Sequence, residues 1–240
     1  VAVVKAGVFS IFRVVFHILG PETLQAANLS VIITTLASVT LLVASLIALT
    51  QDSMKRRLAY STVGQLSYMV LGAGMLSAIG RLGGVMHLAM HAFGKITLFF
   101  CAGAIYVASK KKYISQMDGL GRRMPITFLA FFVGSLSIIG MPPLGGFISK
   151  WNLVIGAVDG GQLILLLVLL VSSLLNAAYF LPIVYRAFFA AAPEGEETGY
   201  KEAPSFCLVP LCLTARAALL LFFYHVSLLR LSQMALGIAP

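Results

Sequence analysis

The chain has 240 residues, of which 60% are hydrophobic and 10% are charged, and its mean hydropathy is +0.98. A soluble domain of this length needs a charged fraction nearer a quarter to cover its surface, so the composition excludes a water-soluble globular protein. The formal net charge of +9 does not indicate nucleic-acid binding, because the basic residues lie in short segments between long apolar runs. Lipid is therefore the expected solvent.

Long apolar segments follow one another along the chain, and each is close to or above the ~20 residues that a helix needs to cross ~30 Å of hydrocarbon. The first begins without an initiator methionine, so we expect the chain to be part of a longer protein. Residues 192–204, with Glu194, Glu196, Glu197 and Glu202, are expected to form a solvated loop without a chemical role. We expect uninterrupted spanning helices at about 1–19, 30–50, 58–78, 84–109, 161–186 and 205–231.

One further apolar segment, 125–158, contains the run Pro142-Pro143-Leu144-Gly145-Gly146, through which a helix cannot continue undisturbed. Its second part, 147–158, would be only about 18 Å long as a helix, too short to span the membrane alone. We therefore predict one broken crossing and an all-α polytopic membrane protein, a single membrane domain of about seven transmembrane helices.

A single broken crossing also gives a consistent distribution of loop charges. It places on one side of the membrane the segments Lys55-Arg56-Arg57, Lys110-Lys111-Lys112, Arg122-Arg123 and Arg186. The loops expected on the opposite side are short and poor in lysine and arginine. The positive-inside rule identifies the basic side as cytoplasmic.

Several ionisable residues lie within the apolar segments, among them Lys5, Arg13, His87, His91, Lys95 and Lys150. An ionised side chain near the membrane midplane costs at least ~2.5 to 3.5 kcal/mol, so such residues usually face a protein interior or a hydrated path. His87, His91 and Lys95 recur at every fourth position, which places them on one helix stripe ~12 Å long. A lone histidine would be interpreted as a core residue, but three titratable groups on one stripe indicate a proton path.

Lys150 follows the Pro-Pro-Leu-Gly-Gly run, where unwound backbone is tolerated only if protein encloses it or it lines a cavity. Burial and the positive N-terminal end of the second half-helix both act against a permanent charge on this amine, which suits proton exchange. The alternative is a structural lysine that hydrogen-bonds carbonyl groups freed by the break. Arg13 and His17 lie nearer a helix end and can reach the headgroups, and the sequence offers no account of Arg216.

Other polar residues in the apolar segments receive no chemical role. Ser61 is explained by close packing between helices, and Gln65 could hold water beside a path. The three cysteines lack the spacing of metal ligands and are interpreted as small hydrophobic residues, so no metal, disulfide or cofactor is expected. They are Cys101, Cys207 and Cys212.

Four short motifs occur in order along the chain. They are Val4-Lys5-Ala6-Gly7-Val8-Phe9, Lys55-Arg56-Arg57-Leu58-Ala59-Tyr60-Ser61-Thr62, His87-Leu88-Ala89-Met90-His91-Ala92-Phe93-Gly94-Lys95 and Met141-Pro142-Pro143-Leu144-Gly145-Gly146-Phe147-Ile148-Ser149-Lys150. Together they resemble the antiporter-like membrane subunits shared by Mrp-type sodium/proton antiporters, respiratory complex I and membrane-bound hydrogenases.

The resemblance implies a fold of fourteen helices with two inverted repeats, of which this chain is similar to the part from the end of the eighth helix onward. The first repeat, with its buried glutamate and lysine, is not in this sequence. The resemblance also implies that Lys5 connects two half-channels and that Lys150 is the terminal lysine of the second broken helix. His87, His91 and Lys95 would form the central relay.

The function implied by the resemblance is that of a proton-conducting subunit in a multisubunit monovalent cation/proton antiporter. Such a subunit would lie in the inner membrane of a bacterium or archaeon, bind other membrane subunits and carry out no enzyme chemistry itself. Lys150 differs from the complex I branch that carries glutamate there, and residues 176–186 are most similar to Mrp D-type subunits.

Two alternatives remain open. A proton-pumping subunit of NADH:quinone oxidoreductase or of a membrane-bound hydrogenase would use the same path, driven by redox energy from other subunits. A receptor or a structural scaffold would share the hydropathy pattern, but neither needs a lysine beside a broken helix.

Overall fold

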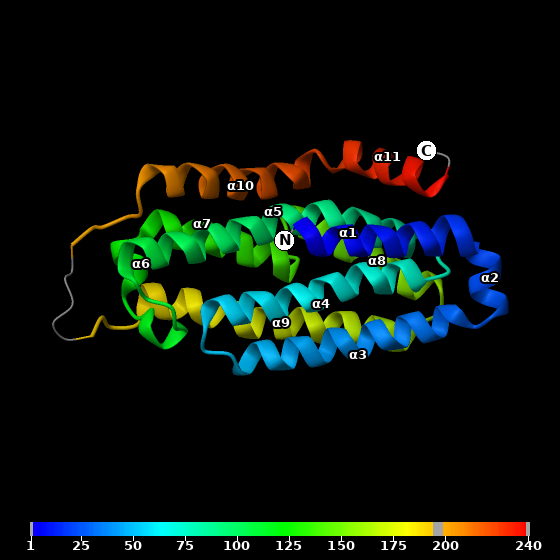
Figure 1. The fold of residues 1–240 in the computed structure, drawn as a ribbon, viewed down its shortest axis with the longest axis horizontal. Coiled ribbons are helices and arrows are strands. Elements are labelled where there is room, and N and C mark those ends of the chain that lie inside the picture. The colour runs from blue at the N-terminus through cyan, green and yellow to red at the C-terminus, as the bar shows by residue number, and fades with distance from the viewer. Residues whose placement is uncertain (1, 194–198, 239–240) are drawn as a thin grey trace.

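A computed structural model describes residues 2–193 and 199–238, and this part of the chain is a helical bundle without β-strands. Five helical stretches within it are long and apolar enough to cross a membrane, which confirms the predicted polytopic all-α fold. The helices run along the long axis of the molecule (Figure 1). In chain order they are α1 (Ala2–Arg13), the π-helical segment η1 (Val14–Leu19), α2 (Gly20–Ala26), α3 (Leu29–Thr50), α4 (Met54–Gly74), α5 (Ala78–Ser109), the 3₁₀ turn η2 (Ile114–Gln116), α6 (Leu120–Arg123), α7 (Pro125–Ile139), α8 (Gly145–Asp159), α9 (Leu163–Phe189), α10 (Ser205–Phe223) and α11 (His225–Leu236).

The first helical stretch is longer than the expected 1–19, because α1, η1 and α2 follow one another without a loop as far as Ala26. Pro21, which we expected to lie beyond the helix, occupies the first turn of α2. A proline is tolerated there because its missing N–H would have no helical partner in any case. Gly20 has a φ of +72°, a conformation that favours glycine and lets the chain change direction into α2 (Figure 1).

Two further helices begin earlier in the chain than the sequence predicted. The expected 58–78 helix is α4, which begins at Met54 with Lys55 in its first turn, and the expected 84–109 helix is α5, which begins at Ala78. The guanidinium group of Arg57 explains the earlier start of α4, since it donates to the backbone oxygen of Gln51 at 2.9 Å. A charged first turn can therefore belong to a buried helix when its side chains find partners at the bundle end. With this turn included, α4 is not among the five stretches that are apolar enough to cross a membrane.

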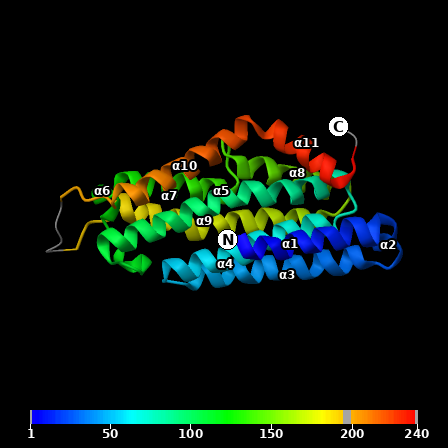
Figure 2. The same cartoon turned by 45° about the horizontal axis from the view of Figure 1, so that its top comes forward.

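The last expected helix, 205–231, is two helices that meet at Tyr224, and the bend is visible in Figure 2. Tyr224 has φ −102° and ψ 24°, outside the helical range. The imidazole Nδ1 of His225 lies 2.7 Å from the backbone oxygen of Phe222. This side-chain contact accompanies the interruption between α10 and α11.

The broken crossing is observed as predicted, with α7 and α8 separated by residues 140–144. Gly140 ends α7 with a φ of +89°, the left-handed conformation typical of a helix C-terminus. A Cβ atom at this position would lie 2.7 Å from Cδ of Lys150, so the glycine also makes room for the lysine side chain. The break thus brings Lys150 against the end of α7.

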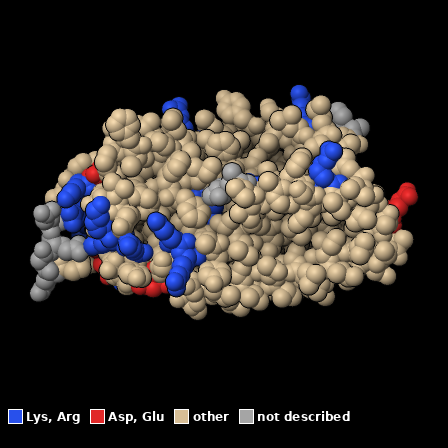
Figure 3. Space-filling view, in the orientation of Figure 1, with Lys and Arg blue, Asp and Glu red and all other residues tan. Residues whose placement is uncertain are grey.

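The four basic segments lie at the same end of the bundle. The backbone of Ser115 donates to the carboxylate of Asp52 at 2.9 Å, which joins the loop before α4 to the loop after α5. Arg186, near the end of α9, donates to Asp118 in that second loop at 2.6 Å. Figure 3 shows lysine and arginine gathered at this end, where α6 lies in Figure 1. The assignment of this end to the cytoplasm remains a prediction.

The loop that precedes α10 is attached to the same end of the bundle. Glu202 accepts hydrogen bonds from the backbone N–H of Ile126 at 2.7 Å and from the hydroxyl of Thr127 at 2.6 Å. It therefore caps the N-terminus of α7, a role that its place in an expected solvated loop did not indicate. Glu194, Glu196 and Glu197 lie outside the described residues.

Helix α5 is the centre of the bundle and contacts α4, α7, α8 and α10. Its approach to α8 depends on Gly83, where a Cβ atom would lie 2.8 Å from the backbone nitrogen of Leu153. Small residues of this kind let helix backbones approach closely inside a membrane. The α5 stripe that carries His87, His91 and Lys95 is consequently enclosed by neighbouring helices.

Candidate functional site

All five sequence-predicted residues are buried in the bundle. The exposed fraction is 9% for Lys5 on α1, 1% for His87 and for His91, 0% for Lys95, and 6% for Lys150 on α8. Charged residues are almost never buried to this degree in lipid unless they are enclosed by protein and have polar neighbours. The arrangement of those neighbours decides what the residues can do.

The two histidines lie one above the other on α5. Their ring centroids are 5.8 Å apart and the rings are nearly parallel, at 22°. Both nitrogens of His91 are buried without a hydrogen-bond partner among the described residues. Buried polar groups of this kind usually bind water. His91 therefore lies where water can connect it to its neighbours.

His87 has a partner at each ring nitrogen. Nδ1 lies 2.8 Å from the hydroxyl of Ser149 on α8, and Nε2 lies 2.9 Å from Oε1 of Gln65 on α4. A hydroxyl and a side-chain amide can each donate or accept, so either neutral tautomer of the imidazole can be satisfied. A ring with this freedom can take up a proton at one nitrogen and release one from the other.

Lys95 lies deepest in the bundle and makes contacts on α4 and α9. Its amine donates to the hydroxyl of Ser61 at 2.7 Å. The hydroxyl of Tyr179 lies 2.9 Å from the same Ser61 oxygen, and the Lys95 amine is 5.5 Å from the ring centroid of Phe180. The amine is thus held by one hydroxyl and one aromatic face, without a carboxylate partner in the part of the chain that the structure describes.

Lys150 reaches back across the break to α7. Its amine donates to the backbone oxygen of Ile139 at 3.1 Å and to the hydroxyl of Tyr68 at 3.3 Å. It also lies 4.3 Å from the ring centroid of Tyr68. We expected the positive end of the second half-helix to dominate its surroundings. The contact with Ile139 instead places the amine at the negative, carbonyl end of the first half-helix.

The amine of Lys5 has no hydrogen-bond partner among the described residues. His91 lies 5.8 Å from His87 by ring centroids and precedes Lys95 by one turn on the same stripe of α5. A proton on any one of them raises the energy of a proton on the others.

The sequence did not identify several side chains that complete this cluster. Tyr68 accepts a hydrogen bond from Lys150, and Tyr179 contacts the Ser61 hydroxyl that Lys95 also contacts. Asn176 accepts a hydrogen bond from Tyr179. Ser61 and Gln65, which we attributed to packing and to a water site, instead contact Lys95 and His87 directly. One signal was present: polar side chains at 172, 176 and 179 recur at helical spacing on an otherwise apolar segment.

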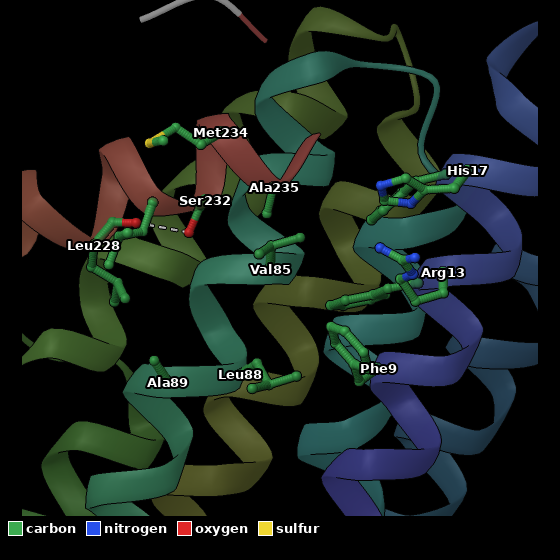
Figure 4. Close-up of a pocket in the computed structure, with 13 residues that line it drawn as sticks. Phe9, Arg13, His17, Val85, Leu88, Ala89, Leu228, Ser232, Met234 and Ala235 are labelled. Carbon is green, nitrogen blue, oxygen red and sulfur yellow. Dashed lines mark hydrogen bonds between the residues drawn. The ribbon is translucent and has the colours of Figure 1, made fainter. Parts of the chain in front are cut away.

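Other candidates lie apart from the cluster. Arg13 and His17 are exposed and line a groove of about 560 Å³ between α1, α5 and α11, which contains none of the five residues (Figure 4). Arg216 is exposed on α10, and nothing in the structure explains it. The described residues contain no group of histidine, cysteine, aspartate or glutamate side chains that could hold a metal ion.

The chain is similar to curated membrane subunits of respiratory complexes. It is 31% identical over 237 residues to NADH-quinone oxidoreductase subunit N of Desulforudis audaxviator, covering 92% of this chain and 46% of that protein. It is 37% identical over 186 residues to subunit L of Rickettsia bellii, covering 77% of this chain and 27% of that protein. The chain therefore spans less than half the length of these relatives.

Solved structures show the same fold. A chain of the Mrp complex from Dietzia sp. DQ12-45-1b matches with a TM-score of 0.87 at 24% identity, over 97% of this chain and 51% of that one. A chain of the archaeal membrane-bound sulfane sulfur reductase matches with a TM-score of 0.86 at 26% identity, over 98% of this chain and 47% of that one. Residues 1–176 match the family described as NADH:quinone oxidoreductase/Mrp antiporter, TM. The chain belongs to this family of integral membrane subunits.

Proposed function

We propose that the chain is the proton-conducting part of a subunit in a multisubunit monovalent cation/proton antiporter. The observation that supports it best is the cluster of three lysines and two histidines, all at most 9% exposed and without a carboxylate partner in the described part of the chain. Nothing in a structural scaffold or receptor requires such a cluster, whose burial is costly in lipid.

The cluster conducts protons by passing them from one side chain to the next, and none of its groups keeps a permanent charge. Because like charges repel one another in a buried site, a proton that enters at one end of the cluster favours departure of a proton from the other end. His87 and bound water connect the two positions. The chain itself makes and breaks no covalent bond other than bonds to hydrogen.

A cation/proton antiporter is favoured over a redox-driven pump by Lys150, since the resembling complex I branch carries glutamate at the equivalent place. The second candidate, a proton-pumping subunit of an NADH:quinone oxidoreductase, is supported by the two sequence relatives, which carry that name. In both cases the partners are other membrane subunits of one complex and the site of action is a bacterial or archaeal cell membrane.

Replacement of Lys95 tests the shared part of the proposal. In the assembled membrane complex, Lys95→Ala should reduce proton transport to background, while the exposed Lys55→Ala should transport normally. Wild-type transport by a normally assembled Lys95→Ala complex would refute proton conduction through this cluster.

Deletion of the gene separates the two candidates. Loss of growth in high sodium or potassium with normal NADH oxidation supports the antiporter. Loss of NADH oxidation with normal salt tolerance supports the oxidoreductase and would contradict our assignment.

A further inference from the structure

Lys150 has polar neighbours that lead away from the histidines. The hydroxyl of Tyr68, to which its amine donates at 3.3 Å, lies 3.4 Å from the hydroxyl of Ser173 on α9. The Lys150 amine is itself 3.4 Å from the same Ser173 oxygen. Asn176 lies one turn further along α9, three residues after Ser173. One side of the Lys150 site is therefore formed by α9.

Lys95 is connected to Asn176 from the other direction. Its amine donates to Ser61, and the hydroxyl of Tyr179 lies 2.9 Å from that serine oxygen. The Tyr179 hydroxyl in turn donates to Oδ1 of Asn176. The contacts of Lys95 thus end at Asn176, one helical turn from Ser173, where the contacts of Lys150 end.

The polar face of α9 is continuous over this distance. Ser172, Asn176 and Tyr179 are spaced at i, i+4 and i+7, which places them on one stripe of the helix, and each is at most 1% exposed. The Ser172 hydroxyl and Nδ2 of Asn176 have no hydrogen-bond partner among the described residues. Buried donors without a hydrogen-bond partner usually bind internal water molecules.

The histidine stripe is less continuous by comparison. His87 contacts Tyr68 and His91 only through its ring, at centroid distances of 5.6 and 5.8 Å. Neither nitrogen of His91 has a partner among the described side chains. A proton that follows α5 must therefore cross two gaps beside His91, whereas the contacts through α4 and α9 leave one gap, between Tyr68 and Asn176.

We propose that Tyr68, Asn176 and Tyr179 form a second proton path between Lys150 and Lys95, parallel to the path through His91. This inference rests on the proposed proton conduction by the two lysines and concerns the route between them. Tyr179 lies beyond the residues 1–176 that match the family, so the family match does not assign it a role.

Proton balance along this path is simple. Each tyrosine hydroxyl, and the Ser61 hydroxyl between Tyr179 and Lys95, accepts a proton on its oxygen as it releases its own to the next acceptor, so no charge stays on these side chains. Asn176 keeps both amide protons and acts as a positioning residue. Its oxygen orients the Tyr179 hydroxyl, and its free N–H donates to a water molecule that carries the proton between the two tyrosines.

The test uses two single variants and their combination in the assembled membrane complex. Tyr179→Phe removes the hydroxyl and keeps the ring that packs 4.6 Å from Phe180. His91→Leu removes the other path. Lys95→Ala gives the background rate of proton transport. Tyr185 is an exposed tyrosine on the same helix, so Tyr185→Phe is the matched control. Proton transport in vesicles is divided by the amount of assembled complex, which separates conduction from a folding defect.

Parallel paths predict a specific pattern of rates. Each single variant should lose about half of the transport rate, and the double variant should fall to the Lys95→Ala background, far below the product of the two single effects. Asn176→Leu should behave as Tyr179→Phe does, and Tyr185→Phe should match the unmodified complex.

Two results would overturn the second path. One is an equal rate for His91→Leu with and without Tyr179→Phe, and the other is complete loss of transport in either single variant. Normal transport by Lys95→Ala would instead refute the proposed function, so the failure of the two proposals can be told apart.

Discussion

The amine of Lys95 on α5 donates a 2.7 Å hydrogen bond to the hydroxyl of Ser61 on α4, and both side chains are at most 1% exposed. Among the described residues this hydroxyl is the one hydrogen-bond partner of the amine, and an amine bonded to a neutral hydroxyl is bound less rigidly than one paired with a carboxylate. The contact holds the lysine in place between α4 and α9 and leaves it able to exchange a proton.

Loss of the Ser61 hydroxyl should therefore impair transport. We expect Ser61→Ala to slow proton transport about tenfold, or about 1.4 kcal/mol, because the Lys95 amine loses its buried partner. The neighbouring Thr62→Ala is the matched control, since the Thr62 hydroxyl bonds only the backbone of its own helix, at Leu58. Equal rates for the two variants in vesicles would show that the contact has no part in conduction.

The close approach of α5 and α8 predicts different effects on stability for two glycine substitutions in α5. Gly83→Ala places a Cβ atom 2.8 Å from the backbone of Leu153, whereas nothing lies within 4 Å of the equivalent position at Gly103 on the same helix. Gly83→Ala should lower the free energy of unfolding by about 1 to 3 kcal/mol. Gly103→Ala should raise it by up to about 1 kcal/mol, because alanine favours the helix. Thermal unfolding in detergent measures both, and a Gly83→Ala protein as stable as Gly103→Ala would contradict the packing.

The ion pair at the basic end should make stability depend on pH. The hydrogen bond from Arg186 holds the pKa of Asp118 below its usual value. The stabilisation is therefore fully present above the unfolded pKa of about 3.9 and is lost as the pH falls through the lower folded pKa. Because both side chains are partly exposed, Asp118→Asn should cost only about 0.2 to 1 kcal/mol at neutral pH. The difference from the unmodified protein should vanish in acid, and a difference that persists there would show that charge is not its cause.

The shared end of the three basic loops predicts their accessibility. In a background in which Cys101, Cys207 and Cys212 are replaced, single cysteines at Lys55 and Lys111 should resist a membrane-impermeant reagent added from outside the cell. A cysteine at Asp159, at the opposite end of the bundle, should react. Reaction at Lys55 but not at Lys111 would contradict the shared end, and reaction at both with protection at Asp159 would invert the topology.

The parts of the structure that the sequence predicted depend on local pattern. The spacing of His87, His91 and Lys95 within one helix determines that they share a face, and the prolines at 142 and 143 require an interruption wherever the surrounding helices lie. Length alone then distinguishes one broken crossing from two. These inferences needed no knowledge of neighbouring helices.

The parts that the sequence missed depend on contacts between distant segments. Arg57 lies within α4 because its guanidinium reaches the backbone oxygen of Tyr179, 122 residues away. Lys150 turns toward Ile139 because the break folds α8 back against the end of α7. Asn176 and Tyr179 looked like isolated polar residues until the packing of α9 on the lysine sites was known. Hydropathy and spacing carry no information about such pairs.

The bond from Lys150 to the Ile139 carbonyl is compatible with proton exchange and with a purely structural charge. Substitution of Lys150 separates these two roles. Arginine keeps its proton across the physiological pH range, so Lys150→Arg preserves the positive charge but removes the ability to release a proton. The decisive measurement is proton transport in vesicles that contain the assembled complex, with the exposed Lys110→Arg as the matched control and subunit assembly checked in parallel. We predict that Lys150→Arg and Lys150→Ala both fall to background while Lys110→Arg transports normally. Normal transport by Lys150→Arg over the working pH range would contradict the claim that this lysine carries protons.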